Sequence, residues 1–384
     1  MSGPAVMLVA VEASGDILGA GLARTLRARV PGVRLFGVGG ARMAEEGIES
    51  PFNTAELSVF GLFEGLAIYP KVLARVKDTV ALAAREKPDV AVLIDSWGFN
   101  LRVAHALRKL NPKIRLIKYV GPQIWASRPG RARTLAAAVD HLLSILPFDE
   151  PYYRPLGLSV TFVGNPSLIL DVSKANGARF RKTIGAGPDD PILLVLPGSR
   201  RGEIARVLPA FADAARILKS ERPGLHIAVV VAETVADLVR AQVAEWPFQP
   251  VLVEGHDPKL DAMKAATVAI ACSGTVTTEL ALAGAPMVVG YKVSGITYAI
   301  GKRLIRTAWI VLLNIAAGRT IIPELIQHDC TGERLAAEVV ARLDDPALRT
   351  RQIDNQNAAL EVMGRGAPDP AIKAAEVVAG FLNA

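Results

Sequence analysis

The sequence predicts an α/β protein of two domains, each built on a parallel β-sheet with helices on both faces. Three observations predict this fold class. The chain has 384 residues, which is more than one hydrophobic core usually organises. Short apolar runs alternate with segments whose apolar residues recur at helical spacing. This alternation occurs twice, on either side of the turn-rich stretch 164–191, which contains "GAGPDDP".

The first half alternates five expected strands with helices. The strands are 6–11, 33–38, 90–95, 114–120 and 141–146, and the helices between them include 17–29, 71–86, 100–110 and 130–138. Strands that are separated by helices pair in parallel, and helices then cover both faces of the sheet.

The second half repeats the pattern. Its expected strands are 191–196, 226–232, 250–254, 267–272 and 286–291, and its helices fall near 203–219, 234–245, 275–284 and 295–306. We therefore expect domains at 1–170 and 171–350. Residues 351–384 are expected to form a helical tail that packs back on the domains.

Composition and charge exclude several classes of protein. Hydrophobic residues make up 51% and charged residues 21%, as in folded globular proteins. The net charge of +7 suits anionic lipid, whereas no aromatic-basic motif points to nucleic acid. Cys272 and Cys330 are the only cysteines and the histidines are scattered, so we expect no metal and no cofactor. No apolar run reaches the ~18 residues of a spanning helix, and the start does not resemble a signal peptide, so we expect a cytoplasmic protein.

Ligands of open parallel sheets bind outside the carboxyl ends of the strands, so the residues that follow each strand are the candidates. The first strand is followed by "EASGD". Ser14 or Asp16 could cap the helix that follows. Alternatively Glu12, Ser14, Gly15 and Asp16 contact the hydroxyl groups or a phosphate of a ligand.

Asp95 ends the apolar strand 90–95. It could cap the next helix, although Ser96 and Asn100 could do so without it. A carboxylate that faces an apolar cleft suits a general base, and we favour that role for Asp95.

The stretch "KYVGPQIWASRPGR" follows the strand 114–120 and mixes aromatic, basic and turn residues. Tyr119, Gln123, Trp125, Arg128 and Arg131 could form a wall that contacts a sugar or a phosphate. The alternative is a proline-broken loop, and for Trp125 alone we favour simple burial.

Two stretches of the second half predict a diphosphate site. In "LPGSRRGEI", Gly198 and Ser199 open a helix beside the guanidinium groups of Arg200 and Arg201. Free amides at a helix start with arginines beside them bind anions. No Gly-Lys-Ser or Gly-Lys-Thr follows, so this is not a Walker loop.

In "ACSGTVTTELALAGAPMVVGYK", Ser273, Gly274 and Thr275 start a helix. Glu279 lies one turn after Thr275 on the same face, where its carboxylate could accept hydrogen bonds from ribose hydroxyls. A helix-capping arrangement explains the Thr275 end of this pattern without a ligand.

Residues 57–77 combine an apolar surface with flanking cations. The apolar side chains that we expect to contact a membrane are Leu62, Phe63, Leu66, Tyr69, Val72 and Leu73. Lys71, Arg75 and Lys77 flank them, as in interfacial elements on anionic lipid. The alternative is that the helix 71–86 simply buries this face against its sheet.

Five stretches together resemble the lipid-A-disaccharide synthase family in order and spacing: "EASGDILGAGL", "KYVGPQIWASRPGR", "LPGSRRGEI", "SGTVTTELALAGAPMVVGYK" and "LNIAAGRTIIPELIQ". The resemblance implies a GT-B fold, with two Rossmann-like domains that face a cleft. It also implies an inverting, metal-independent transfer at the cytoplasmic face of the membrane. UDP-2,3-diacylglucosamine would be joined to 2,3-diacylglucosamine 1-phosphate, giving the β-1,6-linked disaccharide of lipid A and UDP.

The resemblance also implies roles for single residues. Asp95 matches the family's essential aspartate, which we expect to act as the base on the acceptor's 6-hydroxyl. Arg200 matches the arginine of a "PGSR" loop, and Ser273, Gly274, Thr275 and Glu279 match a nucleotide-binding element. Asn314 and Arg319, from the last stretch, are expected on the donor side. The amino-terminal domain would hold the lipid acceptor, with Glu12 to Asp16 along the cleft.

Six positions depart from the family pattern: Val11, Gly98, Gly121, Asn165, Leu313 and Thr320. They leave open a glycosyltransferase that acts on another membrane lipid. The sequence is also compatible with a UDP-sugar 2-epimerase and with a non-enzymatic lipid or nucleotide binder. The tail helices could also exchange between two subunits of a homodimer.

Overall fold

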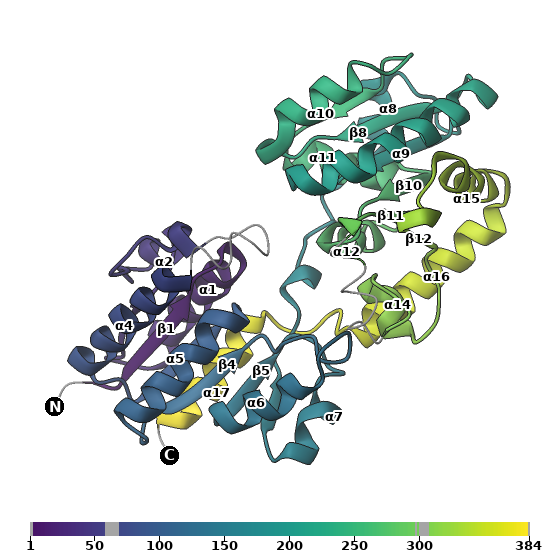
Figure 1. The fold of residues 1–384 in the computed structure, drawn as a ribbon. Helices are drawn as coiled ribbons and strands as arrows, with labels where there is room; N and C mark the ends of the chain where they lie inside the picture. The colour runs from purple at the N-terminus through teal and green to yellow at the C-terminus, as the bar shows by residue number, and fades with distance from the viewer. Residues whose placement is uncertain (1–2, 58–68, 296–297, 299–306, 383–384) are drawn as a thin grey trace. The chain divides into compact units, whose positions relative to one another are not determined.

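The computed structural model describes residues 3–57, 69–295, 298 and 307–382. The chain divides into two compact units. The first unit comprises Met1–Pro166 and Ala367–Ala384, and the second comprises Ser167–Gly366. Each unit contains a six-stranded parallel sheet with helices on both faces (Figure 1). The predicted fold class of two parallel α/β units is confirmed.

The sheet of the first unit has the strand order β2-β1-β3-β4-β5-β6. Its strands are β1 (Ala5–Ala10), β2 (Arg34–Val38), β3 (Val90–Ile94), β4 (Arg115–Tyr119), β5 (His141–Ser144) and β6 (Ser159–Phe162). The strands β1 and β3 are buried throughout, as expected of parallel strands that are covered on both faces.

Two groups of helices cover the two faces of this sheet. On one face, Leu8 packs with Leu22 and Val378, from α1 (Ala13–Arg29) and α17 (Pro370–Leu382). On the other face, Leu93 packs with Val103. The helices there are α4 (Tyr69–Glu86), α5 (Trp97–Leu110) and α6 (Gly130–Ala138). The short helices are α2 (Ala41–Glu45) and α7 (Glu150–Tyr153), with single turns at Thr54–Leu57, Arg154–Leu156 and Pro166–Leu168.

The sheet of the second unit has the order β12-β11-β10-β7-β8-β9. Its strands are β7 (Ile192–Leu196), β8 (His226–Val230), β9 (Val251–Val253), β10 (Val268–Ala271), β11 (Met287–Tyr291) and β12 (Glu324–Ile326). The strands β7 and β10 lie side by side in the middle of this sheet, with Leu196 in register with Ala271.

The helices of the second unit also form two groups. Against Val195 pack α9 (Arg201–Glu221), α10 (Ala236–Val243) and α15 (Gly332–Asp344). Against Leu194 pack α8 (Gly177–Ile184), α11 (His256–Ala265), α12 (Thr275–Leu282), α14 (Leu312–Ala317) and α16 (Pro346–Val362). Single turns lie at Glu233–Val235 and Gln327–Asp329.

The predicted elements are present where the structure describes them, with two strands and several helices added, among them α8, α11, α14 and α15. The strands β6 and β12 were not predicted, because neither is an apolar run: Ser159 is exposed and Glu324 half-buried. The predicted helix 295–306 falls, except for residues 295 and 298, outside the described residues.

The carboxyl-terminal residues belong to both units. The helix α16 packs on α14 and α12 of the second unit, and α17 packs on α1 of the first (Figure 1). The chain thus returns to its amino-terminal sheet after completing the second one.

Candidate functional sites at the strand ends

The carboxyl ends of three neighbouring strands of the first unit carry the predicted acceptor residues. Ala10 of β1, Ile94 of β3 and Tyr119 of β4 stand in register, so the residues that follow them lie at one edge of the sheet. Ser14 Oγ donates a hydrogen bond to Asp95 Oδ2 at 2.9 Å. The structure therefore brings together two of the residues that the sequence singled out.

The backbone at Asp95 is unusual. Asp95 has φ of 52° and Ser96 has φ of 35°, a left-handed conformation that costs non-glycine residues about 1–3 kcal/mol. The Asp95 N–H donates to the Tyr119 carbonyl at 2.9 Å. The Asp95 carbonyl accepts from Asn100 Nδ2 at 3.1 Å and from Lys118 Nζ at 2.5 Å.

Lys118 is a residue that the sequence reasoning missed. Its side chain is buried, 3% exposed, beneath α5 and α6. Burial lowers the pKa of Lys118 to about 7, against the opposing charges of Asp95 and Glu12. The available signal was a lysine inside the strand-forming run "RLIKYV", where Lys is almost never buried without partners.

The residues at the start of α1 have separate roles. The helix begins at Ala13, after Glu12, and Glu12 makes no side-chain cap. Glu12 and Ser14 are exposed, whereas Gly15 and Asp16 are buried.

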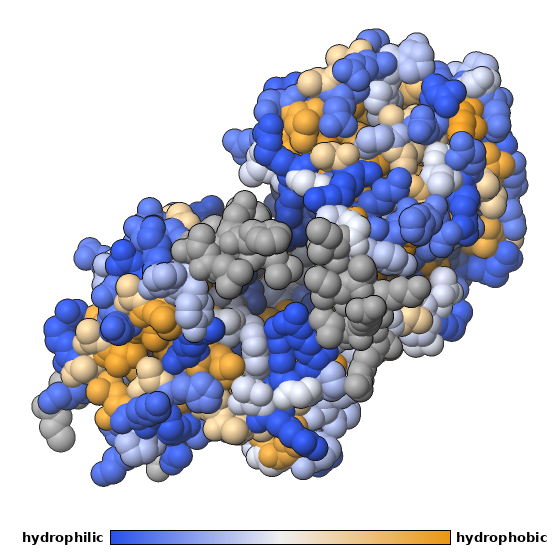
Figure 2. Space-filling model, in the orientation of Figure 1, coloured by the Kyte–Doolittle hydropathy of each residue, from blue (hydrophilic) through white to orange (hydrophobic). Residues whose placement is uncertain are grey.

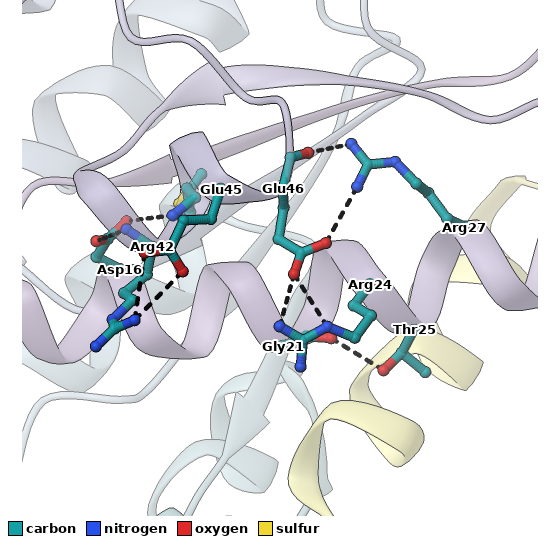
Figure 3. A network of polar contacts seen from close by, with 9 residues as sticks. Asp16, Gly21, Arg24, Thr25, Arg27, Arg42, Glu45 and Glu46 are labelled. Carbon is teal, nitrogen blue, oxygen red and sulfur yellow. Dashed lines mark hydrogen bonds and ion pairs between the residues drawn. The ribbon is translucent and has the colours of Figure 1, made fainter.

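The Asp16 carboxylate turns toward the chain that precedes and begins α2 (Figure 3). It accepts hydrogen bonds from the N–H groups of Gly40 at 2.7 Å, Arg42 at 2.9 Å and Met43 at 3.0 Å. Ion pairs of Arg24 and Arg27 with Glu46 add to this connection between α1 and the end of α2. Asp16 therefore fixes the position of the segment 40–43 relative to the start of α1.

The loop after β4 is held by a buried carboxylate that sequence reasoning also missed. Asp149 accepts from Trp125 Nε1 at 3.1 Å and from Ser144 Oγ at 2.6 Å. Burial raises the pKa of Asp149 to about 6, against those two hydrogen bonds. Trp125 also contacts the Phe148 ring and is half-buried, so the burial that we favoured for it is met only in part.

The other residues of this stretch differ in exposure. Gln123 and Arg128 are exposed, and Arg131 lies over the Trp97 ring. Tyr119 is fully buried in the core of the opposite sheet face, and burial raises the pKa of its hydroxyl. Tyr119 is thus a core residue and not part of the exposed wall predicted for it, because it alternates with Lys118 along β4.

In the second unit, β7 leads into the start of α9 through the "PGSR" loop. Gly198 has φ of 104°, and a side chain there would come within 3.2 Å of Glu203 Oε2. Ser199, Arg200 and Arg201 are exposed. Arg200 pairs with Glu203 at 2.8 Å and Arg201 with Asp237 at 3.0 Å. Both guanidinium groups thus lie at the first turn of a long helix, where an anion would be favoured.

The neighbouring strand β10 leads into α12. Gly274 and Thr275 are exposed there, and Ser273 is half-buried. Glu279 Oε2 accepts a hydrogen bond from Lys259 Nζ of α11 at 2.8 Å, and both side chains are 22% exposed. Because Cys272 N donates to the Leu196 carbonyl, this turn and the "PGSR" loop start from adjacent strand ends.

Asn314 and Arg319 are positioned by contacts within the second unit. Asn314 is fully buried. Its side chain donates to Ile322 O and Glu324 Oε1 and accepts from the N–H groups of Ile321 and Ile322. Asn314 therefore fixes the position of the segment 321–324. Arg319 is exposed and donates to Asn355 Oδ1 of α16 at 2.7 Å.

The described part of the predicted membrane-contact segment lies at the start of α4. Tyr69 is 45% and Leu73 39% exposed, and Val72 is partly buried. Leu62, Phe63 and Leu66 lie outside the described residues. Figure 2 shows apolar residues among charged ones over α4 and α5. Among the described helices, none is long and apolar enough to cross a bilayer.

Within the same described residues, His, Cys, Asp and Glu side chains form no group of three or more that could hold a metal ion. Two of the departures from the family pattern are packing positions, because Val11 and Leu313 are buried in the cores. Thr320 accepts from Trp309 Nε1 at 2.9 Å. At Gly121 a Cβ atom would lie 3.2 Å from the Tyr153 hydroxyl, a closer approach than most side chains make.

Comparisons with solved structures show where this fold recurs. The glycotransferase of kitacinnamycin superposes with a TM-score of 0.62 at 17% identity, covering 99% of this chain and 100% of that one. The UDP-GlcNAc 2-epimerase from Neisseria meningitidis bound to UDP-GlcNAc has a TM-score of 0.59 at 11% identity, covering 99% of this chain and 99% of that one. At these identities the likeness establishes the fold alone.

Sequence comparisons show the family. The model of the family described as Lipid-A-disaccharide synthetase matches residues 6–376. A lipid-A-disaccharide synthase of Rhodospirillum centenum is 42% identical over 379 residues, 98% of this chain and 94% of the relative. One of Myxococcus xanthus is 43% identical over 337 residues, 88% of this chain and 87% of the relative. The chain belongs to the lipid-A-disaccharide synthase family.

Proposed function

We propose that this chain is an inverting glycosyltransferase that condenses UDP-2,3-diacylglucosamine with 2,3-diacylglucosamine 1-phosphate. The products are the β-1,6-linked disaccharide 1-phosphate of lipid A biosynthesis and UDP. One observation carries the proposal: the family match runs through residues 6–376 and includes the strand-end residues of both sheets.

In the proposed reaction the acceptor's 6-hydroxyl oxygen forms a bond to C1 of the donor sugar while Asp95 takes the hydroxyl proton. The bond between C1 and the diphosphate oxygen breaks, and its electron pair leaves with UDP. Attack from the face opposite UDP inverts the anomeric centre. The contact between Ser14 Oγ and Asp95 Oδ2 supports this role, because it orients one carboxylate oxygen and leaves the other for the substrate.

The donor is proposed to bind the strand ends of the second unit. Arg200, Arg201 and the free N–H groups at the start of α9 would stabilise the diphosphate as negative charge develops on it. Ser273, Gly274 and Thr275 would contact the phosphates, and Glu279 would bind the ribose hydroxyls. Because Lys259 holds only Oε2 of Glu279, Oε1 is available for the ribose.

The acceptor is proposed to reach the site from an anionic membrane at the cytoplasmic face. Exposure of Tyr69 and Leu73 beside Lys71 supports a peripheral contact, since apolar side chains rimmed by cations suit a lipid interface. Gln123 and Arg128 would contact the acceptor sugar or its phosphate.

The test is UDP release by the full chain in detergent and EDTA. UDP-2,3-diacylglucosamine is supplied with or without 2,3-diacylglucosamine 1-phosphate. We expect UDP release that depends on the acceptor, with a disaccharide product identified by mass spectrometry. Acceptor-independent conversion of a UDP-sugar into its 2-epimer would show the epimerase instead. UDP-sugar binding with no turnover on this acceptor would contradict the proposed substrate.

A further inference from the structure

Lys118 is a buried lysine whose side chain contacts the backbone of Asp95, the proposed base. Its ammonium donates hydrogen bonds to the carbonyl groups of Leu93 at 3.2 Å, Asp95 at 2.5 Å and Tyr119 at 3.1 Å. Three donors thus meet three acceptors, which is the full capacity of a lysine. All three carbonyls lie at the carboxyl ends of β3 and β4.

The segment that Lys118 contacts is conformationally strained. Asp95 and Ser96 both have left-handed backbones, and Ser96 is the residue before α5 with no side-chain cap. Such a pair persists only when surrounding groups hold it. Apart from the Asp95 N–H bond to Tyr119, the groups that hold the Asp95 backbone are Lys118 and Asn100, and both bind its carbonyl.

Apolar side chains of two helices cover the Lys118 ammonium, and the charged groups near it follow the strands. The helices α5 and α6 present Leu101, Ala104 and Leu135 to Lys118, and these side chains do not titrate. The charged groups that act on it are Asp95, at the end of β3, and Glu12, after β1. The charged partners of Lys118 therefore lie at the edge of the sheet where Ser14 contacts Asp95.

We propose that Lys118 is a positioning residue for the transfer reaction, which fixes the left-handed turn at Asp95 and thereby the position of the Asp95 carboxylate. The inference rests on the proposed role of Asp95 as the base. Lys118 is buried beneath α5, so it acts through Asp95 and touches no substrate.

A buried ammonium has a cost that packing alone does not explain. Desolvating a charge is expensive, and three hydrogen bonds to carbonyl groups offset part of that cost. All three end on the backbone at the carboxyl ends of β3 and β4. A buried charge whose donors converge on the turn of the proposed base is consistent with a role in holding that base in position.

The test compares Lys118→Met with Lys118→Gln, which also lacks the charge but keeps an amide donor. Lys113→Met serves as a control, because Lys113 is an exposed lysine between α5 and β4. Asp95→Asn is measured in the same series. The readouts are kcat and KM for both substrates, and the melting temperature.

We expect Lys118→Met and Lys118→Gln to lower kcat by about tenfold or more, equivalent to roughly 1.4 kcal/mol, with both KM values nearly unchanged. Lys113→Met should keep the wild-type kcat and both KM values. A merely structural role would lower the melting temperature and leave the kcat of the folded protein at the wild-type value.

The two proposals fail in different ways. Retained turnover in Asp95→Asn would overturn the base itself. Loss of turnover in Asp95→Asn, with a wild-type kcat in a folded Lys118 variant, would overturn only the inference about Lys118. If Lys118→Met does not fold, Lys118→Gln decides the same question.

Discussion

At the residue scale, the side chains around the strand ends divide into groups that are free to meet a ligand and groups that hold the backbone. Ser14, Gln123 and Arg128 are exposed. Asp16 and Asn314 are buried, and each binds backbone N–H groups of a neighbouring segment. Both buried residues therefore fix the position of a neighbouring chain segment.

Replacing Asp16 tests this division. The Asp16→Ala protein should lose about 1–3 kcal/mol of unfolding free energy, because three N–H groups at the start of α2 lose their acceptor. Urea denaturation of the full chain measures this loss. Glu45→Ala is the matched control: Glu45 forms only an exposed ion pair with Arg42, and such pairs contribute at most about 1 kcal/mol. Equal stabilities of the two variants would contradict the role of Asp16.

Lys259 orients the Glu279 carboxylate, which we propose to bind the ribose hydroxyls of UDP. Without Lys259, this carboxylate would lose the contact that orients it and offsets its charge. Lys259→Met should therefore weaken UDP binding by about three- to tenfold, as the loss of one half-buried charge-assisted bond predicts. Isothermal titration calorimetry measures the affinity. The exposed Lys264 of the same helix gives the control, and an equal effect of Lys264→Met would show a general charge effect instead.

At the element scale, the loop between β4 and α6 depends on Asp149. Burial holds the pKa of Asp149 near 6, above its value in the unfolded chain. Between about pH 4 and 6 the folded state therefore binds a proton that the unfolded state has released, so the stability from this group is lost as pH rises through 6.

We predict that replacing Asp149 changes how the unfolding free energy depends on pH. Asp149→Asn should remove about 1–2 kcal/mol of the decrease in unfolding free energy that the wild type shows from pH 4.5 to pH 7. Unfolding in urea, followed by tryptophan fluorescence, measures it at both pH values. Glu150→Gln, an exposed neighbour, should keep the wild-type dependence. An unchanged pH dependence in Asp149→Asn would show that this carboxylate is not the titrating group.

The elements show what the sequence could and could not predict. Strands such as β3 and β7 are continuous apolar runs, so pattern alone locates them. The strand β6 is half-exposed at the edge of its sheet, and only its pairing with β5 defines it. The helix α1 starts at Ala13 instead of residue 17, because small residues of its first turn carry no apolar period.

The candidate site was predictable where chemistry and position coincide along the chain. Asp95 and Ser14 could be named because each follows a strand. Lys118 offered one local signal, a lysine inside a strand-forming run, but the burial and the contacts that make Lys118 and Asp149 important arise only in the fold. Tyr119 illustrates the reverse: it ends a strand, but the alternation of side chains turns it into the core.

At the scale of the whole molecule, the chain crosses between the two units twice, near residues 166 and 366. The second crossing leads to α17, where Ala374, Ala375 and Val378 are fully buried against the first unit. The first unit is therefore completed by the last helix of the chain.

Truncation after Gly366 tests the contribution of α17. It should lower the unfolding free energy of the first unit by roughly 3 kcal/mol or more, since several buried apolar side chains lose their partners. UDP affinity, which we assign to the second unit, should stay within about twofold, a difference of less than 0.5 kcal/mol. Hydrogen exchange resolved by peptide separates the two units. Protection of α1 that is unchanged by the truncation would contradict this account.

We propose above all that Asp95 activates the acceptor at the strand edge of the first unit, while the donor binds the second. Turnover by Asp95→Asn at saturating concentrations of both lipid substrates, measured beside its UDP affinity, tests this most directly. We predict unchanged UDP affinity with kcat lowered by at least about a hundredfold, the lower range for loss of a general base. Turnover near that of the wild type, with both substrates bound, would contradict the claim.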